Sequence, residues 1–440
     1  MRRRLAKVIE MLSSRERDRL AGTLARIRSR NVALDEAILS RVSAIMQEVR
    51  ARGDAALIEY AARFDDCVMQ PAELRVEEED LHRTAAHVEL RVRESIREAI
   101  RRVRAFHELE RQHSWVVETD PGVFLGQRVT AIERAGLYVP GGTAGYPSSV
   151  VMNVVPAQIA GVDRVIVSTP PRTLEKNPAV AAALVELDIT EVYAIGGAQA
   201  IAALAYGTET VPRVDKITGP GNSYVAAAKK LVFGVVGIDS IAGPSEVVII
   251  ADDGASASYV ASDLLAQAEH SEDASAILLT TSKALALEVV RELEIQISRL
   301  SRAEVIGESL TRYGAIIVVD AMEEACAVVN DLAPEHLQIM ARDEEEIASR
   351  IRNAGAIFFG PHSPAAVGDY MAGPNHVLPS GGTARFSSGL SVNDFLKRTN
   401  TVKFSAAEIE GTARSIAALA HAEGFDAHAR SVLIRLEEKR

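Results

Sequence analysis

The sequence predicts an α/β protein of two domains, with parallel, incomplete doubly wound (Rossmann-like) sheets and helical segments at both ends. Short buried strands such as 164–169 and 246–251 alternate with helical stretches, and this order forms parallel sheets. A chain of 440 residues is long enough for two domains or more.

Composition and charge are those of an ordinary soluble enzyme. Hydrophobic residues make up 48% and charged residues 25%, and the net charge is −11 with no dominant block of Lys or Arg. This balance argues against a nucleic-acid partner. The basic start at 1–5 is not followed by an apolar run of signal-peptide length, and no stretch approaches the ~20 apolar residues of a membrane span. We therefore expect a cytoplasmic protein with no membrane partner.

The two cysteines, Cys67 and Cys326, are too few for a disulfide framework or a thiolate metal site. Cys326 lies in 324–329, which has the pattern of a packed helix face. Neither cysteine has a histidine nearby in sequence, so we expect neither to be a nucleophile.

The first third of the chain is mostly helical. Residues 1–33 have many charges and few large apolar residues, which is typical of an arm that packs on a partner subunit. Helices are predicted at 39–51 and 55–64, and the clearest one carries an apolar stripe with a period of 3.6 over 92–106. Residues 122–140 alternate and contain β-branched residues, which indicates strands with a turn between them.

From residue 141 onward, strands and helices alternate in two successive units. The expected strands are 164–169, 191–197, 216–218, 246–251, 276–281, 315–319 and 356–359, and helices are expected at 148–160, 178–186 and 198–206. The last fifty residues return to helix.

Three glycine turns follow strands, at 141–145, 196–197 and 219–221. Each could place backbone N–H groups at a helix N-terminus, where a phosphate binds. None has the G-x-G-x-x-G spacing, because 219–224 lacks the third glycine. Ordinary glycines of αβ loops are the alternative explanation.

Gln267 and His270 end a helical stretch over 258–270 whose apolar residues include Leu264. Their spacing places both beside the apolar stripe, so a polar amide and an imidazole end a face that should be buried. Buried polar groups need partners, and a metal ion is one candidate. The alternative is a helix C-terminus, where a histidine interacts favourably with the dipole and a glutamine caps a carbonyl.

Six of the ten histidines fall in the last 171 residues, several in polar segments punctuated by Gly and Pro. Glu335 and His336 follow an apparent helix end, and Asp369 and His376 lie in one long irregular stretch. Loops placed by a rigid scaffold often carry chemistry. Taken alone, Glu335 and His336 could be a solvated loop pair, and His428 a histidine on a surface helix.

Eight short motifs follow one another in order. They are 136–142 (GLYVPGG), 196–200 (GGAQA), 216–222 (KITGPGN), 242–246 (AGPSE), 267–270 (QAEH), 334–337 (PEHL), 368–370 (GDY) and 375–379 (NHVLP). Together they resemble the histidinol dehydrogenase family, from about residue 35 to the C-terminus. The resemblance implies oxidation of an amino alcohol to the amino acid in two NAD-dependent steps, with one bound zinc per subunit.

The resemblance also implies roles for individual residues. The zinc ligands would be Gln267, His270, Asp369 and His428, and the acid–base pair Glu335 and His336. The positions that contact the dinucleotide would be Tyr138, Gln199 and Asn222. Substrate contacts would come from Ser245, His376 and Glu423, together with the zinc ligands and His336. His362 and His421 match no functional position.

One departure from the family pattern concerns the substrate. Family members usually carry a glutamate in a Pro-Glu-x-x-Gly-Asp context, whereas residues 364–369 here read PAAVGD, with Ala365 in its place. The loss removes a partner for the polar end of histidinol, and a similar group of enzymes oxidises a sulfonated propanediol. A dehydrogenase for such a small polar alcohol is therefore one alternative, and a non-catalytic metal- or nucleotide-binding homologue is another.

The expected organisation follows from the same resemblance. Residues 1–33 would be the helical arm, 34–137 with 246–389 the domain of the zinc and catalytic residues, and 138–245 the domain that contacts NAD. The helical tail, 390–440, would dock on the partner of an intertwined homodimer. His428 and Glu423 would then serve the neighbour's active site.

Overall fold

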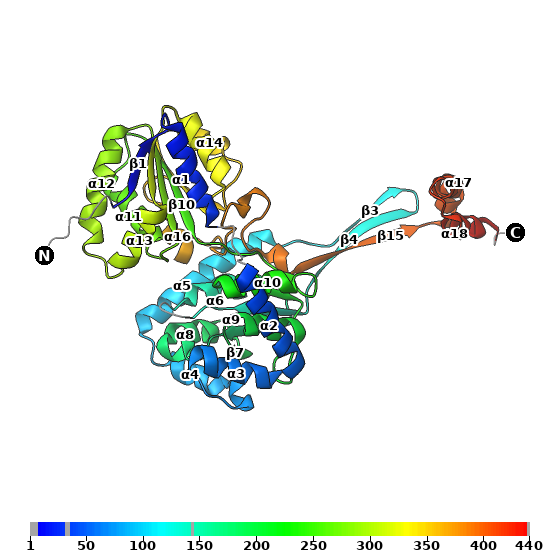
Figure 1. Ribbon diagram of the computed structural model, residues 1–440. Helices are drawn as coiled ribbons and strands as arrows, with labels where there is room; N and C mark the ends of the chain where they lie inside the picture. Colours follow the sequence, from blue (N-terminus) through cyan, green and yellow to red (C-terminus); the bar gives the residue numbers. More distant parts are fainter. Residues whose placement is uncertain (1–7, 31–35, 142–144, 438–440) are drawn as a thin grey trace. The chain divides into compact units, whose positions relative to one another are not determined.

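The computed structural model describes residues 8–30, 36–141 and 145–437. Its contacts divide the chain into two units (Figure 1). The first unit spans Met1–Glu110 and Glu133–Phe395, and the second spans Arg111–Ile132 and Leu396–Arg440. Each unit is described by itself below.

The first unit contains a fully parallel sheet built mainly from the later part of the chain. Its strands are, in spatial order, β1 (Glu10–Ser13), β12 (Ala315–Val318), β11 (Ser275–Thr280), β10 (Glu246–Ala251), β13 (His336–Met340) and β14 (Ala356–Phe359). Every residue of β10 and β11 is buried. Such strands are apolar on both faces because helices cover both sides of the sheet.

The helices that cover this sheet form two layers. On one face lie α11 (Ala257–Ala268), α12 (Lys283–Ile297) and α13 (Ala303–Tyr313). On the other lie α1 (Arg17–Ser29), α14 (Met322–Leu332) and α15 (Glu344–Ser349), and α16 (Ala365–Tyr370) follows β14 (Figure 1). Alternate residues of β10 point to opposite layers, Val247 toward α11 and Val248 toward α14.

A second sheet of the first unit is parallel except at one edge. Its strands are, in spatial order, β2 (Arg75–Val76, antiparallel), β7 (Val192–Ala194), β6 (Arg164–Thr169), β5 (Arg134–Tyr138), β8 (Lys216–Thr218) and β9 (Gly237–Ile238). One face shares a hydrophobic core with α2 (Glu36–Arg52), α3 (Asp54–Asp65), α9 (Gly197–Tyr206) and α10 (Ser223–Val232).

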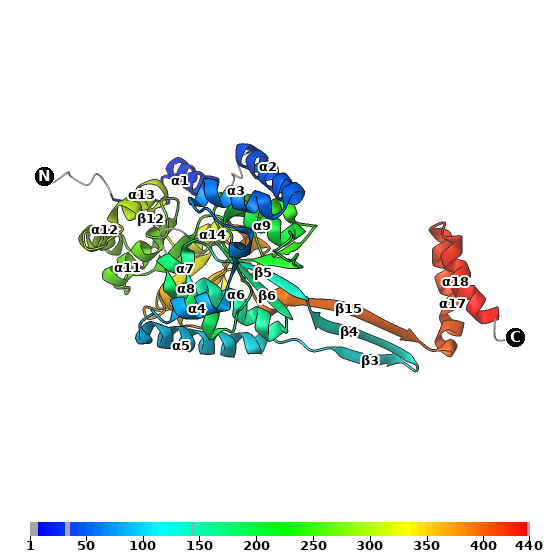
Figure 2. The same ribbon diagram turned by 90° about the horizontal axis from the view of Figure 1, so that it is seen from below.

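The remaining helices of this sheet gather around α6 (Pro147–Ala160), which packs on β5 and β6. They are α4 (Glu78–Ala85), α5 (Leu90–His107), α7 (Thr173–Lys176) and α8 (Pro178–Glu186). Figure 2 shows α4, α5, α6 and α8 on the side away from α2 and α3. Short 3-10 turns lie at Pro71–Leu74, Glu108–Glu110, Thr383–Arg385 and Val392–Phe395.

The second unit combines an antiparallel sheet with a helix pair. The strand order is β15 (Leu396–Phe404), β4 (Val123–Ala131) and β3 (Trp115–Asp120), and α17 (Ala406–Ala422) and α18 (Asp426–Glu437) follow β15. The fully buried cluster between the two helices consists of three alanines, Ala417, Ala420 and Ala429.

The expected arm over 1–33 is wrong in its described part, although α1 is helical as predicted. Residues Glu10–Ser13 form β1, which joins the sheet as a parallel edge strand beside β12. Leu24 and Ile27 of α1 are buried in the core of the same sheet. The charged residues between Arg15 and Arg28 are exposed, while Ile9 and Leu12 supply apolar surface that the sheet buries.

The expected domain of 34–137 with 246–389 also needs correction. Helices α2 and α3 bury Val42 and Leu57 in the core of the sheet formed by 134–238, on the face that α9 and α10 also cover. The strands expected over 122–140 are confirmed as β4 and β5, but β4 belongs to the second unit and β5 to the first. The expected helical tail over 390–440 in fact begins with β15, which pairs with β4 along nine residues.

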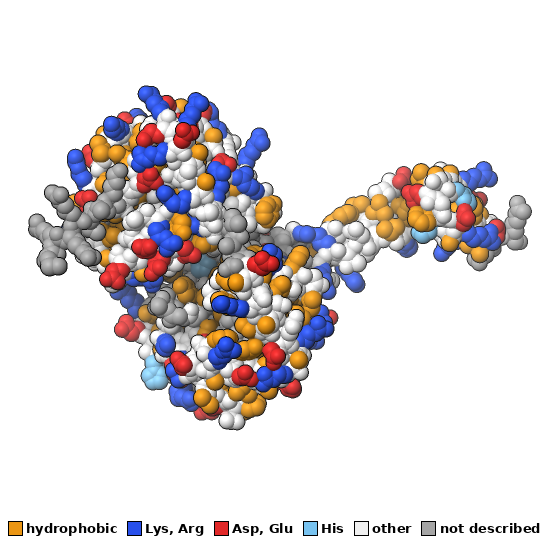
Figure 3. All heavy atoms as spheres, in the orientation of Figure 1, with side chains coloured by type: hydrophobic (Ala, Val, Ile, Leu, Met, Phe, Trp, Pro, Cys, Tyr) orange, Lys and Arg blue, Asp and Glu red, His pale blue; other side chains and the backbone are white. Residues whose placement is uncertain are grey.

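The charge pattern agrees with the composition. Figure 3 shows basic and acidic side chains interspersed on the face in view. Cys326 is buried on α14, as the packed helix face predicts. Among the described helices, none combines the length and the apolarity that a membrane crossing needs.

Candidate active site

Glu335 and His336 lie at the amino end of β13, beside Glu246 at the start of β10. The alternative of a solvated loop pair is wrong, because the two residues are only 7% and 6% exposed. The strand order reverses between β10 and β13, since β10 leads to β11 and β12 on one side and β13 leads to β14 on the other. The pair therefore lies at a switch point of the sheet, at the amino edge rather than at the carboxyl edge where most ligands bind.

The backbone of Glu246 holds both members of the pair. Its N–H donates to Oε2 of Glu335 at 3.1 Å. Its carbonyl oxygen lies 3.2 Å from Nδ1 of His336. Because a carbonyl only accepts, Nδ1 carries the proton and Nε2 of His336 keeps a lone pair that can accept another.

The surroundings shift the pKa values of both groups. Burial raises the pKa of Glu335 to about 7, and the Glu246 N–H and His270 oppose the shift. Burial lowers the pKa of His336, and the carboxylate of Asp369 opposes that shift. At neutral pH the imidazole is therefore unprotonated, while Glu335 exchanges a proton easily.

Gln267 and His270 come from the end of α11. Gln267 is buried in the last turn, and its Nε2 has no hydrogen-bond partner. His270 lies beyond the end of the helix and is exposed, so the expectation that both end one buried face is wrong for His270. Its Nδ1 lies 3.1 Å from the carbonyl oxygen of Ala266, which leaves Nε2 to face a ligand.

Asp369 lies in the last turn of α16, and not in an irregular stretch as expected. Its carbonyl oxygen is 3.0 Å from Nδ1 of His376. His270 and Asp369 both influence the pKa values of Glu335 and His376, so these four side chains lie close together. They meet because helices of such a fold run antiparallel to its strands, which brings helix C-termini to the amino edge of the sheet.

The donor atoms of this group suit zinc, which binds imidazole nitrogen and carboxylate oxygen. The Nε2 of Gln267 has no hydrogen-bond partner, so the amide is free to rotate. Its oxygen could then serve as a further ligand of an ion. Within the described ranges, no three His, Cys, Asp or Glu side chains form a metal-binding group. His428 and Glu423 belong to the second unit, in α18 and at the end of α17.

The three residues expected at the dinucleotide lie at the carboxyl edge of the other sheet. Tyr138 ends β5, Gln199 lies in the first turn of α9 after β7, and Asn222 precedes α10 after β8. The strand order reverses between β5 and β8. This edge at the reversal is where doubly wound sheets bind their ligands.

Hydrogen bonds fix this edge. The hydroxyl oxygen of Tyr138 accepts from the N–H of Gly197 at 3.1 Å, and burial raises the pKa of Tyr138 to about 12, so the phenol stays protonated. Asn222 caps α10 by accepting from Tyr224 and Val225. Gly219 has φ +109°, and a Cβ there would lie 2.1 Å from the carbonyl oxygen of Tyr138, so only glycine allows this close approach. Residues 142–144 of the first glycine turn lie outside the described ranges.

Sequence reasoning missed two residues behind the site, Glu246 and Arg30. The sequence could have indicated Glu246, because it is an acidic residue directly before the apolar run 247–251. No local pattern indicates Arg30, since it reaches the site only through tertiary contacts.

The profile of the family described as "Histidinol dehydrogenase" matches residues 28–436. The chain belongs to the histidinol dehydrogenase family. Its resemblance to this family, seen first in eight motifs, is thereby confirmed, and the family is one of oxidoreductases.

Two curated members of the histidinol dehydrogenase family show how close the relationship is. The chain is 52% identical to histidinol dehydrogenase of Geobacillus kaustophilus over 395 residues, which cover 90% of this chain and 93% of that protein. It is 50% identical to that of Bacillus subtilis over 395 residues, which cover 90% and 92%. A crystal structure of histidinol dehydrogenase from Elizabethkingia anophelis matches the fold with a TM-score of 0.92 and 34% identity, over 98% of this chain and 99% of that one. The predicted α/β class is confirmed.

Proposed function

We propose that this protein oxidises L-histidinol through L-histidinal to L-histidine, the last steps of histidine biosynthesis, with NAD and zinc. The observation that carries the proposal is the buried Glu335–His336 pair beside His270 and Asp369, in a chain 52% identical to a histidinol dehydrogenase. NAD, when bound, would supply the hydride acceptor for both oxidations.

The first oxidation needs a base for the hydroxyl proton. His336 is neutral and its Nδ1 donates to the carbonyl of Glu246, so Nε2 is the atom that accepts this proton. The carbinol carbon loses hydride, the oxygen loses its proton, and the aldehyde results.

The second oxidation needs water on the aldehyde carbon. Glu335 is the group to accept a proton from that water, because its raised pKa makes it a stronger base than an ordinary carboxylate. The hydrate then loses a hydride and a proton and becomes the carboxylic acid.

Gln267, His270 and Asp369, with His428 of the partner subunit, would hold zinc, which supplies a Lewis acid that orients the substrate through its nitrogens. Ser245 and His376 lie beside the acid–base pair and suit substrate contacts. Glu423 would contact the substrate from the partner's tail.

The second unit supports a homodimer in which the tails are exchanged. The sheet lacks the buried hydrophobic face that a sheet of three strands needs, since every residue of β3 is exposed and the helix pair buries only a cluster of three alanines. Large apolar side chains are exposed on it, namely Trp115, Val116, Val402, Leu419 and Phe425. A second copy of the chain would cover them.

Steady-state turnover tests the proposal. L-histidinol should yield two NADH per molecule, and 2,3-dihydroxypropane-1-sulfonate should yield none. The reverse preference would assign the chain to the sulfopropanediol enzymes and explain Ala365. No NADH from any alcohol, despite bound zinc, would indicate a non-catalytic homologue.

Metal removal should abolish activity. Dialysis against a chelator should stop NADH production, and one zinc per chain should restore it, because the substrate loses its anchor without the ion. His270→Ala and Asp369→Ala should lower the zinc content of the purified protein, whereas His421→Ala should not. Full turnover in a preparation shown to be metal-free would contradict this assignment.

A further inference from the structure

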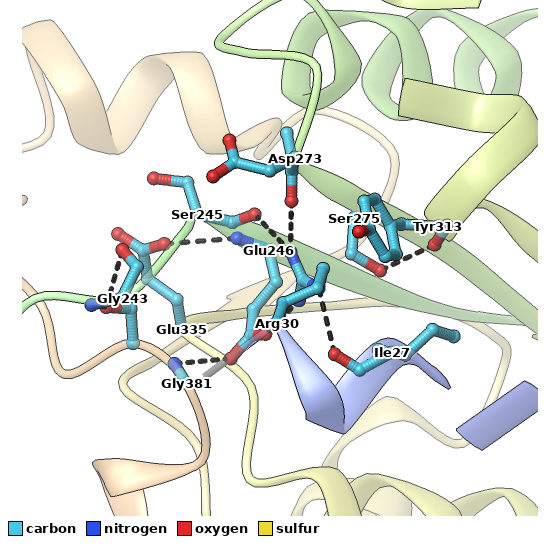
Figure 4. Close-up of polar contacts among 12 residues, drawn as sticks. Ile27, Arg30, Gly243, Ser245, Glu246, Asp273, Ser275, Tyr313, Glu335 and Gly381 are labelled. Carbon is cyan, nitrogen blue, oxygen red and sulfur yellow. Dashed lines mark hydrogen bonds and ion pairs between the residues drawn. The ribbon is translucent and has the colours of Figure 1, made fainter. Parts of the chain in front are cut away.

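The carboxylate of Glu246 lies in a buried polar cluster behind the Glu335–His336 pair (Figure 4). Its Oε2 is 2.6 Å from Nη2 of Arg30, and the two side chains are 8% and 1% exposed. Its Oε1 accepts from the N–H of Gly381 at 3.0 Å. One carboxylate thus ties together the end of α1, the start of β10 and the segment around Gly381.

The guanidinium of Arg30 is fixed from several sides. Its Nη1 donates to the carbonyl oxygen of Asp273 at 2.7 Å, and its Nε to that of Ile27 at 2.9 Å. Its Cζ lies 5.5 Å from the ring centroid of Tyr313. Figure 4 shows Arg30 extending from the end of α1 between these groups. A planar guanidinium held in this way sets the position of its carboxylate partner closely.

The same residue that Arg30 holds by its side chain contacts the acid–base pair by its backbone. The N–H and carbonyl of Glu246 bind Glu335 and His336. Movement of the Glu246 carboxylate therefore moves the peptide groups that orient both proton-transfer groups. Arg30 reaches the site through the segment Ser245–Glu246, because its Nη1 also donates to the carbonyl oxygen of Ser245 at 3.4 Å.

We propose that Arg30 and Glu246 are positioning residues, whose buried ion pair fixes the Glu246 backbone and thereby orients Glu335 and His336 in both oxidation steps. The inference rests on the proposed function, because it assigns these residues to that reaction.

Stability alone does not account for this pair. Burial lowers the pKa of Arg30 and raises that of Glu246, and each partner opposes the shift of the other, so desolvation works against both charges. Apolar side chains of similar volume often stabilise a fold as well as a buried ion pair does. The Arg30–Glu246 ion pair fixes the peptide groups that bind Glu335 and His336. This positioning explains why two charged side chains are buried here.

The decisive experiment replaces Arg30 and follows the two oxidations separately. In Arg30→Met, kcat should fall roughly 10- to 100-fold for histidinol and for supplied histidinal alike, the scale expected when a displaced group is misaligned. The KM values should change little, because Arg30 does not touch substrate. Arg30→Lys, which keeps the charge, should recover part of the loss.

Two further variants separate positioning from stability. Arg26→Met removes another arginine of α1, whose Nη2 pairs with Glu10 at 2.8 Å away from the site. It should lower the melting temperature and leave kcat unchanged. The double variant Arg30→Met/Glu246→Gln removes the unpaired charge, so it should melt higher than Arg30→Met yet remain slow. It also provides the kinetic test if Arg30→Met does not fold.

The outcomes distinguish this inference from the proposed function. A wild-type protein without histidinol turnover would contradict the proposed function, whatever the variants do. With an active wild type, a normal kcat in Arg30→Met would overturn the positioning role. So would an equal loss in Arg26→Met, or a double variant that regains both its melting temperature and its kcat.

Discussion

Replacement of His336 by alanine should slow alcohol oxidation by ~10²–10⁴, the usual contribution of a positioned general base. The imidazole is neutral because burial lowers its pKa, and its Nδ1 is committed to the carbonyl of Glu246. Nε2 is thus the one ring atom left to take the hydroxyl proton. Single-turnover formation of NADH from histidinol measures the effect.

A matched control and a contrasting variant sharpen this test. His362→Ala removes a histidine outside the site and should keep the wild-type rate. Glu335→Gln should slow the oxidation of histidinal more than that of histidinol, because its proton transfer belongs to the addition of water. The opposite order in Glu335→Gln would contradict the role given to Glu335, and a wild-type rate in His336→Ala would contradict that of His336.

Activity should return when two inactive variants are mixed, if the tails are exchanged between subunits. His336→Ala damages the chain's own site, whereas His428→Ala damages the partner's. In a mixed dimer, one site carries both lesions and the other carries neither. Random pairing makes half of the dimers mixed, so about a quarter of wild-type activity should return if the sites act independently.

The measurement requires refolding the two variants together and showing that mixed dimers form. Refolding each variant alone provides the baseline, and mixing His336→Ala with His270→Ala is the control, since both lesions then fall in the chain's own site. Absence of recovery in proven His336→Ala/His428→Ala dimers would mean that His428 serves its own chain or no site.

Local sequence patterns determined much of the framework. The apolar runs at 247–251 and 315–318 predicted buried strands, and the stripe over 92–106 predicted the face of a helix. Glycine-containing motifs marked where strands end, because few residues other than glycine allow such turns. The motifs around Glu335, His270 and Asp369 indicated the family before any contact was known.

Tertiary structure alone decided that the polar segments 336–340 and 10–13 form strands. The strand β13 begins with His336 and contains Gln338, so its sequence lacks the apolar pattern that made β10 recognisable, and pairing with β10 and β14 sets its conformation. Glu10–Ser13 becomes a strand because the edge of β12, about 300 residues away, offers unpaired backbone groups.

The same distinction between local pattern and tertiary contact applies to the site: the acid–base residues were predictable from the sequence, and the ion pair behind them was not. His336 and Glu335 belong to a short motif, so the sequence by itself determined their candidacy. Arg30 and Glu246 are 216 residues apart and form no local pattern. Only the packing of α1 against the sheet brings the two charges together, because a buried guanidinium needs a carboxylate and the fold places Glu246 within its reach.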